Sequence, residues 1–223
     1  MNETDILEVD KSISKSIGKY LYFFIKRLFD IICAIIGIVF LIPIAIIVKI
    51  SYMLTGDFKS IFYSHERIGK NGKLFKLYKF RSMVPNADKI LEELLKEKKY
   101  KEEWDKNHKL DNDPRITKMG NILRKTSLDE MPQFINVLIG DMSLIGPRPL
   151  VKGELNQHKG NHEIYEKVRP GITGWWACNG RSATDYKARL ELEYYYVNNC
   201  SILLDIKCIF LTIKAVISRA GAK

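Results

Sequence analysis

The sequence contains few cysteines, and their spacing fits neither a metal centre nor a disulfide framework. Cys33, Cys178, Cys200 and Cys208 are the only four among 223 residues, and no two of them form a CxxC pair. Two of them lie in apolar segments, where a thiol packs like a small apolar side chain. We therefore expect packed, reduced cysteines and a chain that faces the cytosol.

Two binding motifs are also missing. The cluster Gly69-Lys70-Asn71-Gly72 resembles a phosphate loop, but it lacks the spacing GxxxxGK[ST]. No recognised nucleic-acid motif is present, although the pair Trp175-Trp176 could stack on a base or simply pack. We therefore expect no nucleic-acid partner.

Acidic residues are outnumbered by basic ones. The chain has 36 Lys and Arg against 26 Asp and Glu, which gives a formal net charge of +10. Such a balance implies anionic partners, namely acidic lipid head groups, phosphorylated substrates or nucleic acid. Composition alone does not choose among these partners.

One segment is almost wholly apolar. Ile31 to Val48 reads IICAIIGIVFLIPIAIIV, which is 18 residues without a charge and meets the lower length limit of a membrane helix. A secretory signal is a poorer match, because its apolar region is shorter and ends in a small-residue cleavage site. The sequence predicts a basic, loose lead-in at 1–19, a membrane helix at 20–54 and a separate domain at 55–223.

Basic residues flank this segment on both sides, so both flanks look cytoplasmic by the positive-inside rule. Pro43 interrupts the segment and removes a helical hydrogen bond. A re-entrant helix that breaks near Pro43 keeps both flanks on one side of the membrane. A kinked helix that spans the membrane is the alternative, because membrane helices tolerate proline.

The rest of the chain predicts an α+β fold that is mainly helical with a small β-hairpin. Lys59 to Phe80 has apolar residues on both sides of a glycine-rich turn, as in a hairpin. A single charged helix is expected from residue 86 or 87 to about Leu110, and two more from Thr184 to Asn198 and from Ser201 to Arg219. The last has a broad apolar arc, which fits an interfacial amphipathic helix or a core helix.

The stretch from Arg124 to Pro149 carries the chemistry. It contains the adjacent carboxylates Asp129 and Glu130 and a rigid Pro-Arg-Pro corner around Arg148. Apolar residues at helical spacing predict a helix that Gly140 ends. Its start is either Ser127, in a capping box with Glu130, or Asp129, which is preferred.

Either start places both carboxylates at the positive end of the helix dipole. Acidic residues are also common in first turns for stability alone. The two carboxylates point about 100° apart on a helix, so separate roles are more plausible than a shared proton.

Five ordered blocks resemble the bacterial sugar transferase family, the monotopic phosphoglycosyl transferases or undecaprenyl-phosphate sugar phosphotransferases. The blocks are KFRSM (79–83), DPRIT (113–117), LRKTSLDEMPQ (123–133), GDMSLIGPRP (140–149) and RPGITGWW (169–176). The resemblance implies a monotopic membrane protein at the cytoplasmic face of the plasma membrane. It also implies transfer of a phosphosugar from a UDP-sugar to undecaprenyl phosphate, with release of UMP, as the first membrane step of surface glycan assembly.

The resemblance also implies roles for individual residues. Asp129 matches the nucleophile that forms a covalent phosphosugar intermediate, and Glu130 matches the residue that positions or deprotonates the lipid phosphate. Mg²⁺ is held beside Asp129 in the family. Arg124 and Arg148 match phosphate-binding positions.

Three further residues join the expected site. Lys79 and Arg81 close the hairpin with cations that could face the anionic site, although solvated surface charges are common. Glu193 stands where many members of the family have Asp. A non-catalytic scaffold that binds anionic membrane lipid through its basic charge is the competing function, and it gives Asp129 no role.

Overall fold

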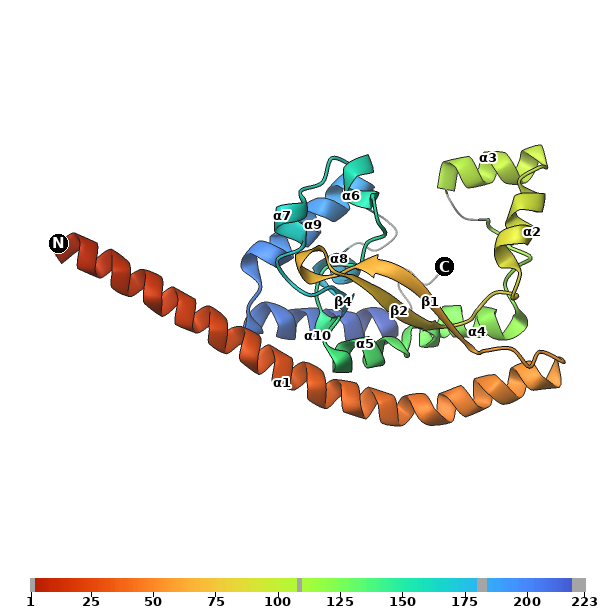
Figure 1. The fold of residues 1–223 in the computed structure, drawn as a ribbon, viewed down its shortest axis with the longest axis horizontal. Coiled ribbons are helices and arrows are strands. Elements are labelled where there is room, and N and C mark those ends of the chain that lie inside the picture. Colours follow the sequence, from red (N-terminus) through yellow and green to blue (C-terminus); the bar gives the residue numbers. More distant parts are fainter. Residues whose placement is uncertain (1–2, 108–109, 180–183, 218–223) are drawn as a thin grey trace. The chain divides into compact units, whose positions relative to one another are not determined.

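The computed structural model describes residues 3–107, 110–179 and 184–217, and this part of the chain is mainly helical with two small sheets (Figure 1). The helices are α1 (Glu3–Leu54), α2 (Ala87–Leu94), α3 (Lys98–Asn107), α4 (Lys118–Thr126), α5 (Gln133–Ile139), α6 (Glu154–Gln157), α7 (His162–Tyr165), α8 (Trp175–Asn179), α9 (Tyr186–Asn199) and α10 (Ile202–Ile217), with 3₁₀ turns η1 (Lys70–Gly72) and η2 (Leu128–Glu130). The strands are β1 (Phe62–Ile68), β2 (Leu74–Phe80), β3 (Ser143–Ile145) and β4 (Gly171–Thr173). The expected α+β fold, mainly helical with a β-hairpin, is confirmed, whereas the monotopic membrane arrangement stays a prediction.

The chain divides into two compact units. The first takes segments 1–37, 66–77 and 133–222, and the second takes segments 38–65 and 78–132 together with residue 223. Helix α1 and the β1–β2 hairpin therefore each contribute residues to both units. Each unit is described by itself below.

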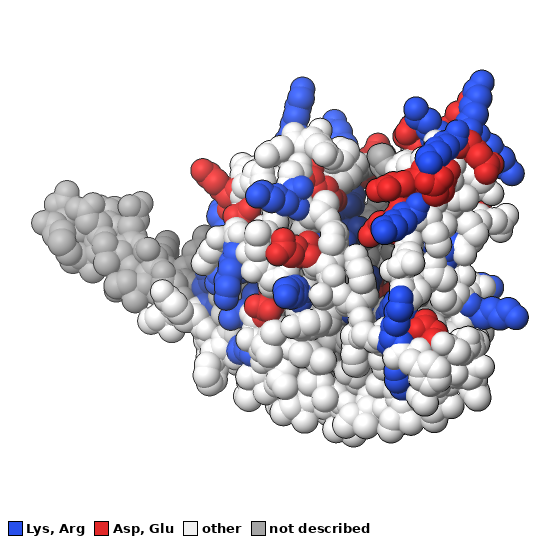
Figure 2. Space-filling view, turned by 45° about the vertical axis from the view of Figure 1, so that its right-hand side comes forward, with Lys and Arg blue, Asp and Glu red and all other residues white. Residues whose placement is uncertain are grey.

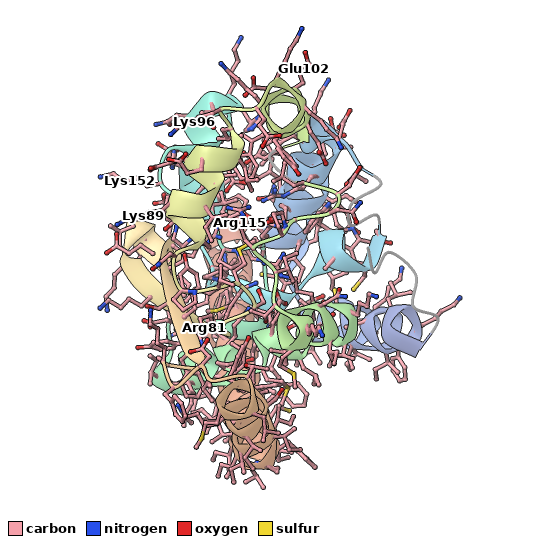
Figure 3. All side chains as sticks on the ribbon, turned by 90° about the vertical axis from the view of Figure 1, so that its right-hand side faces the viewer. Arg81, Lys89, Lys96, Glu102, Arg115 and Lys152 are labelled. Carbon is pink, nitrogen blue, oxygen red and sulfur yellow. The ribbon has the colours of Figure 1, made fainter. Side chains whose placement is uncertain are left out.

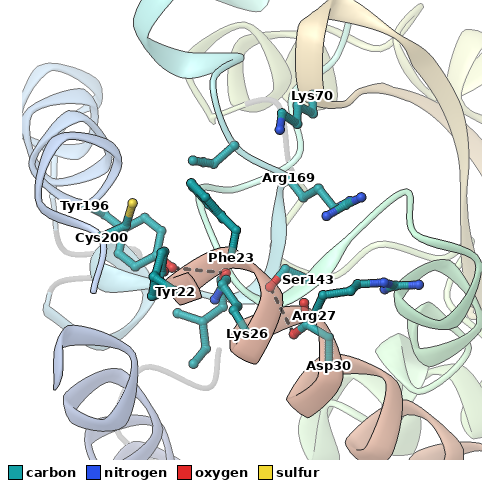
Figure 4. A pocket seen from close by; sticks show the side chains of 12 residues that line it. Tyr22, Phe23, Lys26, Arg27, Asp30, Lys70, Ser143, Arg169, Tyr196 and Cys200 are labelled. Atoms are coloured by element: carbon teal, nitrogen blue, oxygen red, sulfur yellow. Dashed lines mark hydrogen bonds between the residues drawn. The ribbon is translucent and has the colours of Figure 1, made fainter. Parts of the chain in front are cut away.

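In the first unit, α1 presents a polar stripe to the rest of the unit. Tyr22, Lys26 and Asp30 are four residues apart, a spacing that places side chains on one helical face. Figure 4 shows these side chains along α1 beside Ser143 and Tyr196. The same face continues with Ala34, which is fully buried.

Two carboxylates connect this stripe to the unit. Asp205 of α10 accepts hydrogen bonds from Lys26 Nζ at 2.7 Å, from the Tyr22 hydroxyl at 3.0 Å and from the Tyr196 hydroxyl at 2.7 Å. Asp30, only 2% exposed, accepts from Ser143 Oγ at 3.0 Å and from the Leu144 N–H at 2.9 Å. Buried charges are costly unless they are paired in this way.

Close packing extends the contact along α1. A Cβ at Gly37 would lie 2.5 Å from the ring of Phe134, so only glycine allows α5 this close. Arg27 donates to the carbonyls of Val137 and Leu138 at the C-terminal end of α5. An arginine at that end stabilises carbonyls that have no helical partner.

The other face of α1 is apolar and exposed. Between Ile17 and Leu54 the helix is long and apolar enough to cross a membrane; its most apolar 18 residues have a mean hydropathy of 3.3, and only 22% of them are buried. Exposed aliphatic and aromatic side chains along a helix require an apolar surrounding. This exposed apolar surface is suited to a membrane, and re-entry or spanning stays a prediction.

In the second unit, the end of α1 packs against the segments that follow β2. Leu41, Val48 and Tyr52 of α1 are buried. The Tyr52 hydroxyl bonds with the Arg81 carbonyl and with Thr117 Oγ1. Helices α2 and α3 carry alternating acidic and basic side chains (Figure 2), and Lys89, Lys96 and Glu102 point outward (Figure 3).

Several local expectations are confirmed and others are wrong. The hairpin and the helices near 184–198 and 201–219 are present. Residues 3–19 form the start of α1 rather than a loose lead-in, and α1 continues through Pro43 without the expected break. The charged helix divides into α2 and α3, because residues 95–97 turn between them.

A second sheet was not expected. Strands β3 and β4 pair in parallel, with Ser143 opposite Gly171 and Ile145 opposite Thr173. The loop RPGITGWW therefore contains a strand. Helix α10 buries Leu204 and Cys208 but exposes Leu203 and Phe210, so one face packs in the unit. Its interfacial position stays a prediction.

Replacing Asp205 with Ala should destabilise the first unit by about 3 kcal/mol, because it leaves the Lys26 ammonium and the Tyr22 hydroxyl without their acceptor and leaves the Tyr196 hydroxyl only the Ile145 carbonyl. Thermal unfolding of the purified protein in nanodiscs would measure the loss. Lys214→Ala, at an exposed position of the same helix, is the control and should change Tm little. Equal Tm values for the two variants would contradict the role of Asp205.

Candidate active site

The two adjacent carboxylates lie in a tight turn. Asp129 and Glu130 belong to η2, which directly follows the C-terminal end of α4. Ser127 ends α4 in the left-handed conformation, with φ 56°, and its N–H donates to the carbonyls of Leu123 and Arg124. Helix α5 begins only at Gln133, so the expectation that the carboxylates occupy its first turn is wrong. The reason is that the chain between α4 and α5 must turn within 127–132.

Lys79 brings a cation to these carboxylates from β2. Its Nζ lies 2.7 Å from Glu130 Oε1 and 3.9 Å from Asp129 Oδ2. The side chain of Asp129 is 16% exposed, against 39% for Glu130. The structure thus brings together three of the predicted site residues, with Asp129 the most enclosed of the three.

Arg124 is held beside the turn by the segment after β2. Its Nε donates to Ser82 Oγ at 2.9 Å. Ser82 is itself fixed, because its carbonyl accepts from the Thr117 N–H at 3.1 Å and Met83 pairs with Ile116. Gly120 lies so close to Ser82 that an added Cβ would be 1.9 Å from the Ser82 carbonyl oxygen. Glycine at 120 therefore allows α4 to pack on this segment.

Burial and charge compete at Asp129. Burial raises the pKa of the Asp129 carboxyl, and the neighbouring Glu130 raises it further. Lys79 and Arg124 lower the pKa, but the balance is upward. An additional cation beside Asp129 would lower this pKa and favour the ionised carboxylate.

Arg81, the other cation of the hairpin, has protein partners. Its Nη2 lies 2.7 Å from Asp57 Oδ2, and its guanidinium lies over the ring of Tyr52 at 4.8 Å. Arg81 is 9% exposed and lies among other side chains (Figure 3). These contacts give Arg81 a structural role, and its phosphate-binding role stays a prediction.

Arg148 and Glu193 belong to the first unit. The backbone N–H of Arg148 donates to Glu193 Oε1 at 3.1 Å, and the Tyr165 hydroxyl donates to the Arg148 carbonyl. The side chain of Arg148 is exposed, and its guanidinium lies over the ring of Trp176 at 5.8 Å. Glu193 is buried, at 1% exposed.

Sequence reasoning missed the supporting residues. Ser82 lies inside the block KFRSM, which was a usable signal, but its link to Arg124 spans 42 positions. Tyr165 lies outside all five blocks and is brought to Arg148 only by the fold. Ser127 gave no local signal for a left-handed conformation, which non-glycine residues adopt rarely.

The carboxylates fit Mg²⁺ only together with a substrate. No group of three or more His, Cys, Asp or Glu suited to a metal ion occurs among the residues that the structure describes. Mg²⁺ commonly binds through one or two carboxylates plus substrate phosphates, and it prefers oxygen ligands. The enclosed carboxylate of Asp129 and the neighbouring Glu130 can supply such oxygens.

Comparison with known proteins identifies the class. The model of the bacterial sugar transferase family matches residues 21–219. The chain is 43% identical to an undecaprenyl-phosphate galactose phosphotransferase of Salmonella typhimurium over 99% of its own length and 45% of that protein. It is 43% identical to the exopolysaccharide production protein ExoY of Sinorhizobium fredii, over 88% of this chain and 87% of that protein.

A third relative is the UDP-glucose:undecaprenyl-phosphate glucose-1-phosphate transferase of Escherichia coli, which is 38% identical over 88% of this chain and 41% of that protein. The chain thus spans less than half the length of several curated relatives that it matches. The chain belongs to the bacterial sugar transferase family, and the resemblance carried by the five blocks is confirmed.

Replacing Gly120 with Ala should push α4 away from Ser82 and so displace Arg124 and the turn at Asp129. We expect a loss of at least about 2 kcal/mol in stability, as overpacking typically costs, and loss of transferase activity. Thermal unfolding and an activity assay would measure both. Gly18→Ala is the control, because an added Cβ meets nothing within 4 Å there. Normal stability of the Gly120 variant would contradict the close approach.

Proposed function

We propose that this chain transfers a sugar phosphate from a UDP-sugar to undecaprenyl phosphate, giving undecaprenyl-diphosphate-sugar and UMP. The observation that carries the proposal is the enclosed carboxylate of Asp129, with Glu130 beside it and Lys79 and Arg124 as flanking cations. The names of the relatives support both substrates, because they specify undecaprenyl phosphate as acceptor and galactose or glucose units as cargo. The sugar itself is left open.

The first step uses Asp129 as nucleophile. A carboxylate oxygen attacks the phosphorus that carries the sugar, a bond from that phosphorus to oxygen forms, and the bond to the bridging oxygen of the diphosphate breaks. UMP leaves with that oxygen and its electron pair. The product is a phosphosugar bound covalently to the carboxyl of Asp129.

The second step returns the carboxylate. An oxygen of undecaprenyl phosphate attacks the same phosphorus, and the bond to Asp129 breaks. Glu130 is suited to position the acceptor phosphate or to take its proton, because it lies one residue away and is more exposed. Division of the transfer into two steps lets UMP leave before the lipid arrives.

Cations must offset the charge of substrate and nucleophile. Lys79 and Arg124 lie at the turn, and Arg148 has an exposed guanidinium on a rigid backbone. An arginine can grip a phosphate through two N–H groups. Mg²⁺, held by Asp129 with the donor diphosphate, would supply further charge neutralisation.

The reaction implies a location. We propose that the chain works at the cytoplasmic face of the plasma membrane, where UDP-sugars are made and the lipid acceptor is embedded. The apolar, exposed face of α1 supports membrane association. Exopolysaccharide production by a relative that this chain largely covers supports a role in surface glycan assembly.

The proposal is tested by assaying UMP release with a panel of UDP-sugars, undecaprenyl phosphate and Mg²⁺ in nanodiscs. Donor alone should give a phosphosugar adduct on the peptide that contains Asp129, detected by mass spectrometry. Release of UMP without any adduct would overturn the covalent step. No release of UMP with any donor, together with binding to anionic vesicles, would favour the non-catalytic lipid-binding scaffold.

Asp129→Asn should abolish turnover and yet raise stability at high pH. Because the folded-state pKa of Asp129 is raised, the carboxyl contributes most stability below its unfolded-state pKa, and this is lost as pH rises through the folded-state pKa. The neutral amide avoids that loss. We expect Tm to rise by a few degrees at pH 8, with little difference at pH 4. An active variant, or a Tm lowered at pH 8, would contradict the assignment.

Both ends of α1 should lie in the cytoplasm if the helix re-enters the membrane. Single cysteines are placed at Asn2 and Asp57 in a variant whose four native cysteines are replaced by Ser. Both should be protected from an impermeant thiol reagent in intact cells, and permeabilisation should expose them. Labelling at Asn2 alone would establish a spanning helix. Pro43→Leu restores a backbone donor and should shift the pattern toward that result.

A further inference from the structure

The corner Pro147-Arg148-Pro149 has one backbone N–H, because proline has none. That N–H belongs to Arg148 and donates to Glu193 Oε1 at 3.1 Å. The neighbouring carbonyls are also engaged. The Pro147 carbonyl accepts from the Gly171 N–H at 2.8 Å, and the Arg148 carbonyl accepts from the Tyr165 hydroxyl. Glu193 is thus the acceptor for the single donor of this corner.

Glu193 is buried beneath the surface on which the Arg148 side chain is exposed. Glu193 is 1% exposed and Tyr165 is also buried, whereas the Arg148 side chain is exposed. Glu193 Oε2 has no hydrogen-bond partner among the residues that the structure describes. A carboxylate enclosed to this extent acts on the backbone of Arg148 and has no room to touch a sugar nucleotide.

The charges around Glu193 come from four elements. Arg189 of the same helix and Arg148 face it as cations, Glu154 of α6 faces it as an anion, and Tyr165 comes from α7. Burial raises the pKa of Glu193 to about 7. The hydrogen bond from the Arg148 N–H and the two guanidiniums act in the opposite direction and lower this pKa. Both guanidiniums also lie over the ring of Trp176, at 5.8 and 4.9 Å.

We propose that Glu193 is a positioning residue that holds the Arg148 peptide, so that the exposed guanidinium is aimed at a substrate phosphate. The inference rests on the proposed function, in which Arg148 binds phosphate. Glu193 was expected among the site residues. In this proposal it acts through Arg148 and does not contact the substrate directly. Tyr165 completes the support from the carbonyl side of the same residue.

The test is a double-mutant cycle on kcat/KM for UMP release at pH 8. Glu193→Leu removes the acceptor and should lower kcat/KM about tenfold, whereas Glu193→Gln retains an acceptor oxygen and should stay within about threefold. In an Arg148→Ala background, Glu193→Leu should cause no further loss. Glu191→Leu, two residues away on α9 and exposed, is the matched control and should match the wild type.

Additive losses from the two positions would overturn the proposal, because independent effects indicate that Glu193 does not act through Arg148. Equal, tenfold losses for the Gln and Leu variants would overturn it as well, since the acceptor oxygen that Gln retains would then not preserve activity. A general structural role would lower Tm and the activity of the Leu variant equally in both backgrounds.

A readout without activity separates this inference from the proposed function. The corner contributes a single exchangeable amide, so hydrogen exchange of a peptide that contains Pro147–Pro149 reports on Arg148 N–H. Its exchange should accelerate at least about tenfold in Glu193→Leu and remain slow in Glu193→Gln. Unchanged exchange in the Leu variant would overturn the positioning role. Absence of UMP release from the wild type would defeat the proposed function and leave this measurement valid.

Discussion

The structure depends on how the charged side chains of one long apolar helix are paired with the rest of the protein. Lys26, Arg27 and Asp30 lie within the long apolar helix α1, where an unpaired buried charge is costly. Each finds its partner in protein, at Asp205, at the end of α5, and at Ser143 and the Leu144 N–H. The same contacts that pair these charges attach the helix to the rest of the first unit. One set of interactions therefore both pairs the charges of α1 and anchors this helix to the unit.

The turn at Asp129 differs from α1 in how its charges are paired. The protein encloses a carboxylate, adds a second carboxylate beside it, and supplies cations that only partly compensate. A site designed for stability alone would place a neutral side chain there. In the proposed function, a substrate-bound cation would supply the positive charge that the protein itself does not provide at Asp129.

The sequence predicted local features better than long-range ones. Periodicity identified the helices near α9 and α10, and Gly140, with φ 93°, follows α5 as expected. The three-residue strand β4 was missed because its partner β3 lies 28 residues earlier and nothing local marks it. The break between α2 and α3 was missed because the charged pattern continues across it.

The candidate site shows the same division. Family blocks identified Asp129, Glu130 and Arg124 without any structure, and Lys79 joins them in the fold at 2.7 Å from Glu130. Arg81 is two residues from Lys79, and yet its partners Asp57 and Tyr52 could not be inferred from the pattern. Side-chain partners distant in sequence are determined by packing, which a single sequence does not encode in a readable form.

The stripe on α1 also limits how this helix can change in evolution. Tyr22, Lys26, Asp30 and Gly37 must share one face, and each residue added between them turns the following positions by about 100°. A single insertion in that stretch would turn Asp30 away from Ser143 or place a side chain against Phe134. Relatives that retain these contacts should therefore keep the length from 22 to 37 constant, whereas the part of α1 before Tyr22 is free to vary.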